Sequence, residues 1–212
     1  MKSLQCRLCS NDNDILEVQG PDHRSYHHCN NCYLIFTNTE NLLPVEEERY
    51  RYLLHDNRIE NKGYVEFLYR IISPALQYLK PGMSGLDFGC GPSPVLACLL
   101  SREGYKCSYY DPIFFNKSEE FDKYDFIFAT ECFEHFFFPK KELNLLRKLL
   151  NKDGLLAIMT EVWKNINQFK DWYYARETTH VSFYHLKTLQ FIAKELQTNI
   201  IYTDDKRIFL LK

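Results

Sequence analysis

After Pro81-Gly82 the chain alternates short apolar segments with amphipathic ones. The segments with strand character cover residues 85–88, 107–110, 124–130 and 154–160, and those with helical spacing begin at residue 139 and cover residues 186–196. Strands that alternate with helices are typical of βαβ units around a parallel sheet. The sequence therefore predicts an α/β domain over residues 81–212.

The helix that follows the first strand has recognisable boundaries. Ser93 can cap it, Pro94 suits the first helical position, and Gly104 stands just past its end. Residues 199–212 are predicted as two strands that are joined by a polar turn at 203–206. The domain thus ends in a hairpin and not in another βαβ unit.

Two cysteine motifs near the N-terminus predict a metal site. Cys6 and Cys9 form one Cys-x-x-Cys pair and Cys29 and Cys32 form another, at a spacing that suits a tetrahedral four-thiolate site. Four thiolates fill the coordination shell of Zn²⁺ and leave no position for a substrate, so we predict a structural zinc. The alternative is four ordinary reduced thiols, which would leave residues 1–40 without an evident reason to fold.

The chain is predicted to have three parts. Residues 1–40 are a zinc ribbon, residues 41–80 are a helical linker or lid, and residues 81–212 are the α/β domain. Helical spacing runs over residues 45–79, and residues 57–63 are predicted to separate two helices.

Composition limits the location and the partners of the chain. The formal net charge is only -2, and acidic side chains outnumber basic ones in the first forty residues, which is a poor electrostatic footprint for nucleic acid. No apolar stretch approaches the roughly 18–20 residues that cross a bilayer, and the N-terminus does not resemble a signal peptide. With cysteines placed for metal binding, we expect a cytoplasmic protein that binds no membrane.

A ligand-binding loop is indicated where the first strand ends. From Asp87 through Gly89 to Gly91 the strand ends in a Gly-x-Gly and leads into a helix, so backbone amides gather at a helix N-terminus. The third glycine of a dinucleotide fingerprint would fall on Pro94, which disfavours a nicotinamide cofactor and an oxidoreductase.

Asp111 supplies a second signal for the same site. It follows the next strand, where a carboxylate can accept both hydroxyls of a ribose. The alternative for Asp111-Pro112 is a turn that ends the strand, and the alternative for Asp87 is a residue that binds the amides of the loop. Together the two carboxylates favour a cofactor that contains a ribose.

Several segments resemble the motifs of class I S-adenosylmethionine-dependent methyltransferases. They are residues 86–92, 110–112, 124–127, 130–135 and 150–154. The cysteine pairs and residues 53–57 and 172–181 resemble a bacterial subgroup with an N-terminal zinc ribbon. The resemblance covers nearly the whole chain and implies a Rossmann-like, mostly parallel sheet whose last strand is antiparallel.

The resemblance also implies S-adenosylmethionine as the cofactor. Gly89 and Gly91 would pass beneath its methionine part, Asp87 would lie near its amino group, and Asp111 would hold its ribose. Glu131 and its neighbours would border the site of methyl transfer. The cofactor-binding residues implied are Asp87, Phe88, Gly89, Gly91, Asp111, Pro112 and Glu131.

The chain departs from the family between Asp111 and Tyr124. A crossover with its helix needs at least about 10–12 residues, so the family's third strand does not fit there. We expect six strands in the order 2-1-4-5-7-6 in the family's numbering. The acid that meets the adenine has no counterpart, and Phe114 and Phe115 either cover the adenine or fill the core.

Four residues are candidates for binding or deprotonating the methyl acceptor. His135 and His180 could remove a proton, Arg176 could bind an acidic group, and Tyr184 could donate a hydrogen bond. The alternative for each histidine is a structural role in its loop.

The acceptor is predicted to be a small molecule. Asn-Pro-Pro-Tyr and Asp-Pro-Pro-Tyr motifs are absent after the fourth-strand position, which disfavours methylation of base or glutamine amino groups. Ribosomal RNA methylation is the alternative within the same chemistry. A cofactor-binding scaffold without turnover, or a zinc-ribbon interaction protein, is the alternative from another class.

Overall fold

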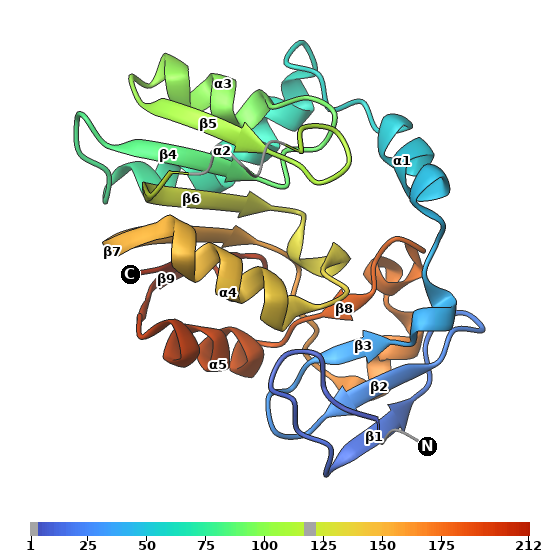
Figure 1. Cartoon of the computed structure of the whole chain (residues 1–212). Helices are drawn as coiled ribbons and strands as arrows, with labels where there is room; N and C mark the ends of the chain where they lie inside the picture. The colour runs from blue at the N-terminus through green and yellow to red at the C-terminus, as the bar shows by residue number, and fades with distance from the viewer. Residues whose placement is uncertain (1–3, 117–121) are drawn as a thin grey trace.

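The computed structural model describes residues 4–116 and 122–212, and its main sheet has the predicted topology (Figure 1). Its strands are β4 (Ser84–Phe88), β5 (Lys106–Tyr110), β6 (Tyr124–Thr130), β7 (Leu150–Met159), β9 (Ile200–Thr203) and β10 (Ile208–Leu211). Their order is β5-β4-β6-β7-β10-β9, which is 2-1-4-5-7-6 in the family's numbering. β4 to β7 run parallel, and β10 pairs antiparallel with β7 and β9. The predicted fold class is confirmed.

The described part of the chain between β5 and β6 contains no third strand, as predicted. It forms a tight turn in which the amide of Phe115 donates to the carbonyl of Asp111 at 2.9 Å, an isolated bridge beside the end of β5. β5 is therefore an edge of the sheet.

The sheet is covered by helices on both faces (Figure 1) because alternate residues of its strands are apolar on both sides. In β6, Phe126 and Phe128 pack on one face, and Ile127 and Ala129 pack on the other. The first face carries α2 (Lys62–Leu76) and α3 (Val95–Arg102), and the second carries α4 (Pro139–Leu149) and α5 (Leu186–Leu196).

The start of α3 differs from the sequence prediction. Pro94 is the N-cap and not the first helical residue, and the side chain of Ser93 makes no capping bond, so the prediction of a Ser93 cap is wrong. Instead Oδ2 of Asp87 accepts the amide of Ala97 at 3.3 Å. A side chain from β4 thus satisfies one of the free amides of the helix. Gly104 follows the helix with a φ of 90°, as predicted.

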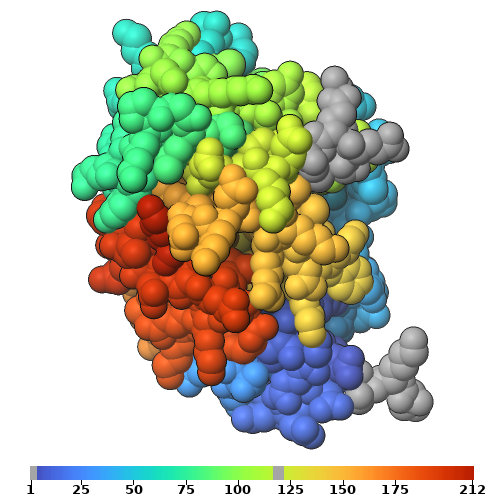
Figure 2. All heavy atoms as spheres, turned by 60° about the vertical axis from the view of Figure 1, so that its left-hand side comes forward, coloured from blue at the N-terminus to red at the C-terminus, as the bar shows by residue number. Residues whose placement is uncertain are grey.

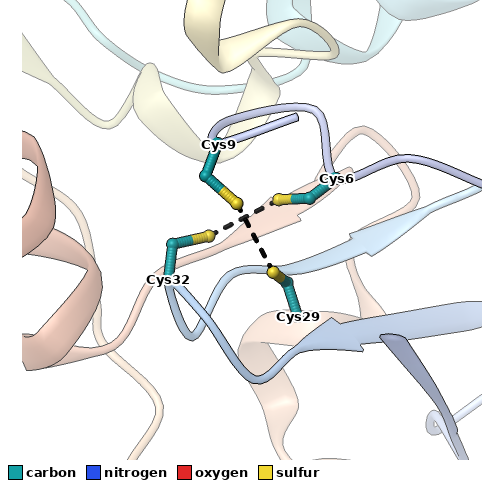
Figure 3. A group of neighbouring side chains, drawn as sticks. All are labelled: Cys6, Cys9, Cys29 and Cys32. Carbon is teal, nitrogen blue, oxygen red and sulfur yellow. Dashed lines mark hydrogen bonds between the residues drawn. The ribbon is translucent and has the colours of Figure 1, made fainter. Parts of the chain in front are cut away.

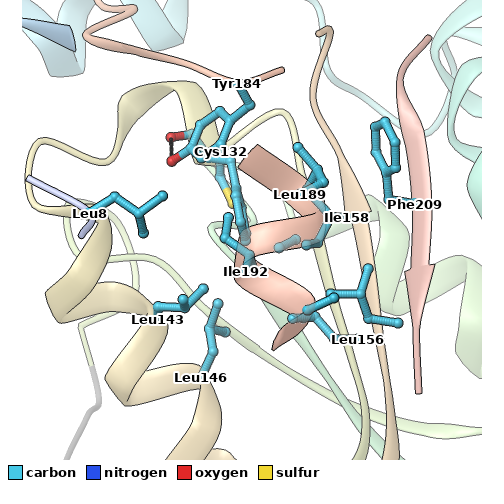
Figure 4. Close-up of a cluster of buried hydrophobic side chains, with 14 of the residues drawn as sticks. Leu8, Cys132, Leu143, Leu146, Leu156, Ile158, Tyr184, Leu189, Ile192 and Phe209 are labelled. Carbon is cyan, nitrogen blue, oxygen red and sulfur yellow. Dashed lines mark hydrogen bonds between the residues drawn. The ribbon is translucent and has the colours of Figure 1, made fainter. Parts of the chain in front are cut away.

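The N-terminal ribbon is joined to the α/β domain. Its strands are β1 (Ile15–Val18), β2 (Tyr26–Cys29) and β3 (Ile35–Thr37), and β8 (Ser182–Phe183) completes their sheet. Phe183 lies opposite Ile35 in this pairing. Leu8 from the ribbon packs in one core with Leu143 and Leu146 of α4 (Figure 4). In the space-filling view the ribbon lies directly against the later segments of the chain (Figure 2).

The predicted pair of helices between ribbon and sheet is present, as α1 (Val45–Leu53) and α2 with a break between them. α1 buries none of its residues and exposes Tyr50 and Leu53. Within the described residues, further helical turns are η1 (Thr39–Asn41), η3 (Phe133–His135), η4 (Ile166–Asp171) and η5 (Tyr173–Arg176). Within the described ranges, the helices are all too short or too polar to span a bilayer.

Candidate active site

A cleft of about 1350 Å³ opens at the carboxyl ends of β4, β5 and β6. It is lined by the loops after these strands, by residues of α1 and by residues from 173 to 180. All the predicted cofactor-binding residues line it: Asp87, Phe88, Gly89, Gly91, Asp111, Pro112 and Glu131. Three of the predicted acceptor-side residues, His135, Arg176 and His180, line the same cleft.

The glycine loop after β4 has a backbone that requires glycine at two positions. Gly89 and Gly91 have φ angles of 76° and 64°. A Cβ atom on Gly89 would lie 2.6 Å from Cβ of Cys132, whereas a Cβ atom on Gly91 would meet open space. The amide of Gly89 donates to the carbonyl of Tyr110 at 2.8 Å, which fastens the loop to the end of β5.

Asp111 connects this loop to the turn after β5. Its Oδ2 accepts the amide of Gly91 at 3.0 Å, and its Oδ1 accepts the amides of Ile113 and Phe114 at 2.8 and 3.0 Å. The side chain therefore holds the strand-ending turn. Because a carboxylate offers about four lone-pair positions, it can still accept further hydrogen bonds from a ligand in the cleft.

Asp87 is completely buried at the base of the cleft. Its Oδ2 accepts the Ala97 amide, but its Oδ1 has no hydrogen-bond partner among the described residues. Burial raises the pKa of this carboxyl to about 7, and the nearby Asp111 adds to the rise. A buried acceptor without a partner is costly unless a ligand satisfies it.

Glu131, which follows β6 and lines the same cleft, has a similar character. It has a φ of 47°, which is unusual for a residue other than glycine. Its Oε2 accepts from Arg207 at 2.7 Å, while its Oε1 is buried without a partner in the described chain. Burial and then Glu134 raise the pKa of Glu131 to about 8, although Arg207 opposes the rise. Arg207 also pairs with Glu161.

Two buried carboxyl oxygens without a hydrogen-bond partner in the described ranges, Oδ1 of Asp87 and Oε1 of Glu131, make the cleft suitable for a cationic ligand. S-adenosylmethionine carries an ammonium and a sulfonium, and its ammonium can donate to Oδ1 of Asp87. A Cβ atom on Gly91 would meet open space, and the carboxylate of Asp111 lines the same cleft. The residues present therefore fit this cofactor.

Two histidines that line the same cleft have fixed orientations. Nδ1 of His135 bonds to the carbonyl of Thr179 at 3.0 Å, and Nδ1 of His180 bonds to the carbonyl of Tyr174 at 2.7 Å. The two ring centroids are 4.9 Å apart. Burial, followed by the nearby His135, holds the pKa of His180 well below its usual range.

Glu134 lies beside these rings and was not singled out by the sequence. Its Oε1 accepts from the hydroxyl of Tyr174 at 2.6 Å, and its Oε2 accepts from Thr160 at 2.8 Å. Its partners come from distant parts of the chain, so only the fold reveals the group. Arg207 was missed for the same reason.

The remaining two acceptor-side candidates differ from each other. Arg176 is exposed at the cleft, and no ion pair holds its guanidinium within the described chain. Tyr184 is fully buried, and its hydroxyl donates to the carbonyl of Phe133 at 3.0 Å (Figure 4). It is not part of the cleft lining, and its observed position is that of a core residue.

The four N-terminal cysteines converge on one point (Figure 3). Sγ of Cys6 lies 3.4 Å from Sγ of Cys32, and Sγ of Cys9 lies 3.6 Å from Sγ of Cys29. All four sulfurs lie within 4.8 Å of one another. Zn–S bonds of about 2.3 Å in a tetrahedron place the sulfurs about 3.8 Å apart, so this arrangement is compatible with a zinc ribbon.

The strand order is that of the Rossmann-like fold of class I methyltransferases, and the cleft lies at the carboxyl ends of its parallel strands. The family model described as "Methyltransferase domain" matches residues 57–203. The chain belongs to this methyltransferase family, and it is a methyl-transferring enzyme. The resemblance found in the sequence is thereby confirmed. The family match gives no support to the alternative of a nicotinamide oxidoreductase.

Solved structures share the fold at low sequence identity. A chain of the complex between the Haloferax volcanii Trm112 methyltransferase activator and the putative methyltransferase is 12% identical, with a TM-score of 0.53 over 72% of this chain and 92% of that chain. An O-methyltransferase family protein from Burkholderia thailandensis is 12% identical, with a TM-score of 0.51 over 78% and 62% of the two chains.

A third structure, an O-methyltransferase family 2 protein from Planctomyces limnophilus in complex with apigenin, is 10% identical, with a TM-score of 0.50 over 83% and 63% of the chains. A search of curated protein sequences gives no significant match. At such identities the structural likeness is evidence for the fold alone.

Proposed function

We propose that this enzyme transfers a methyl group from S-adenosylmethionine to a small-molecule acceptor in the cleft. The observation that carries the proposal is that one cavity is lined by both sets of predicted residues. Asp87, Gly91 and Asp111 would form its cofactor side, and His135 and His180, which line the same cavity, would form its acceptor side. When bound, the cofactor supplies a methyl group that is activated by a sulfonium.

The cofactor side would bind by charge and shape. Asp87 would accept from the ammonium of the cofactor through its free Oδ1, and Asp111 would accept from the ribose while keeping its bonds to the loop. Phe88, Gly89 and Pro112 would form the surface on which the cofactor lies, and Glu131 would border the methyl group.

The acceptor side favours a small molecule with a hydroxyl or acidic group. The cavity volume of about 1350 Å³ exceeds the roughly 300–1,000 Å³ of a site for one ligand, so a second molecule has room beside the cofactor. Arg176 would bind an acidic group of the acceptor. His135 and His180 would contact the group that is methylated, and Nε2 of each ring faces no partner in the described chain.

The cysteine cluster would hold one structural zinc. Cys6, Cys9, Cys29 and Cys32 would fill its shell as thiolates, so the ion would take no part in catalysis. Its contribution would be to hold the ribbon against the segment that carries β8 and the acceptor side of the cleft.

Incubation of the protein with methyl-labelled S-adenosylmethionine and fractionated cell extract tests the proposal. We expect label in the small-molecule fraction, and less of it with Arg176→Ala. Label in RNA would favour the ribosomal RNA alternative. Cofactor binding without transfer to any fraction would favour a scaffold and overturn the proposal.

A further inference from the structure

Three side chains on the acceptor side form a cluster that the cofactor does not explain. Glu134, His135 and His180 each offer one ligand atom, and these atoms lie within 4.8 Å of one another. Glu134 and His180 are buried, and His135 is half-buried at the cleft. One carboxylate with two imidazoles is a donor set for zinc and other first-row divalent ions with open coordination positions.

The histidines are oriented as metal ligands are. A metal-binding imidazole almost always uses its other ring nitrogen to donate to a carbonyl or carboxylate, which fixes its tautomer. Here Nδ1 of both rings bonds to a backbone carbonyl, that of Thr179 for His135 and that of Tyr174 for His180. The lone pair of each ring is therefore on Nε2, and no hydrogen bond to either Nε2 occurs within residues 4–116 and 122–212.

The carboxylate is supported in the same way. Tyr174 and Thr160 donate to the two oxygens of Glu134 at 2.6 and 2.8 Å, and each oxygen retains a lone pair. Tyr174 holds two members of the cluster, because its hydroxyl binds Glu134 and its carbonyl binds His180. The amide of Val181 donates to the carbonyl of Glu134 at 2.8 Å and links the two loops.

We propose that Glu134, His135 and His180 bind a divalent first-row metal ion, separate from the ion of the cysteine cluster. Its nitrogen and oxygen donors favour Zn²⁺, Mn²⁺, Fe²⁺ or Co²⁺ over Mg²⁺ or Ca²⁺. Three protein ligands leave positions open toward the cleft, where an oxygen of the acceptor can bind.

The catalytic role of this ion rests on the proposed function, whereas metal binding itself does not. An ion at this position lowers the pKa of a bound hydroxyl, whose O–H proton then passes to water. The oxygen forms the new bond to the methyl carbon as the bond from sulfur to that carbon breaks. With the ion in place the two imidazoles act as ligands and neither acts as the base. The acceptor class is then a hydroxyl-bearing small molecule.

Cobalt titration of the full-length protein, with its cysteine site filled by zinc, tests the site. We expect one further equivalent of Co²⁺ to bind with visible d–d absorption and without thiolate-to-cobalt charge transfer. Failure to bind this equivalent, or charge-transfer bands from thiolates, overturns the proposal.

Variants identify the ligands. His135→Ala and His180→Gln should abolish the second cobalt site, and Tyr174→Phe should weaken it by roughly 10–100-fold because it removes an outer-shell bond. His55→Ala is the matched control, because His55 is exposed in the same cleft and lies outside the cluster. Wild-type-like cobalt binding in both ligand variants contradicts the assignment, and circular dichroism checks that each variant is folded.

The same samples separate the two proposals. Methyl transfer without a second cobalt site would overturn the metal inference alone. A second cobalt site without methyl transfer would overturn the proposed function and leave the metal site standing.

Discussion

Oδ2 of Asp111 accepts the backbone amide of Gly91 at 3.0 Å, so one carboxylate joins the glycine loop after β4 to the turn after β5. The two loops that would hold opposite ends of the cofactor are therefore fixed relative to each other before any ligand binds. Such preorganisation lowers the entropic cost of binding.

Replacement of Asp111 by alanine should weaken S-adenosylmethionine binding by roughly 1.5–3 kcal/mol, because charge-assisted hydrogen bonds are lost. Isothermal titration calorimetry measures the change. Asp125→Ala is the control, since Asp125 accepts the amide of Ser84 at the opposite end of the sheet. Unchanged affinity in Asp111→Ala would remove this residue from the cofactor site.

The two loop glycines should respond differently to alanine. Gly91→Ala meets no neighbour and suffers only the positive φ, which costs about 1–2 kcal/mol. Gly89→Ala adds a contact of 2.6 Å with Cys132 and should lower the melting temperature further. Gly82→Ala, with a φ of 89° and open space, is the control outside the cleft. Equal losses at positions 89 and 91 would contradict the described packing.

Cofactor affinity should depend on pH through Asp87. Its pKa is raised to about 7 in the free protein, and the ammonium of the cofactor requires the ionised form. Affinity should therefore be nearly constant just above pH 7 and fall about tenfold for each unit below it. The Asp87→Asn variant should bind the cofactor more weakly, and its affinity should not change with pH over this range. A wild-type affinity independent of pH between about 5.5 and 7 would argue against an Asp87–ammonium contact.

Zinc removal should affect more than the ribbon. Because β3 pairs with β8 and Leu8 packs against α4, loss of the ion should reduce amide protection in residues 4–37 and also near β8. α2 and α3, which pack in the core on the other face of the sheet, should stay protected. Hydrogen exchange before and after chelation measures this, and uniform loss of protection in all segments would contradict it.

Much of the fold could be predicted from the sequence because its signals are local. The bounds of β6 and α5 agree with the prediction, since apolar alternation and helical spacing are unbroken there. The absence of a third strand from the described residues between β5 and β6 was predicted from chain length alone. The capping of α3 by Asp87 was missed because the capping group comes from a preceding strand and not from the helix boundary.

The candidate site was less predictable because it is assembled from distant segments. The glycine loop and Asp111 carry sequence signals, but Arg207 meets Glu131 only through the pairing of β10 with β7. Tyr184 shows that residue type alone can suggest a site residue that the fold places in the core. Its polar hydroxyl suggested a site residue, yet a buried tyrosine can satisfy its hydroxyl on a backbone carbonyl, as this one does.

Calorimetric titration of the wild-type protein with S-adenosylmethionine tests the central claim most directly. The cleft after β4 and β5 should bind one cofactor per chain, and Asp87→Asn and Asp111→Ala should each weaken this binding. Absence of binding to the folded wild-type protein, or binding that neither substitution weakens, would contradict the assignment of this cleft.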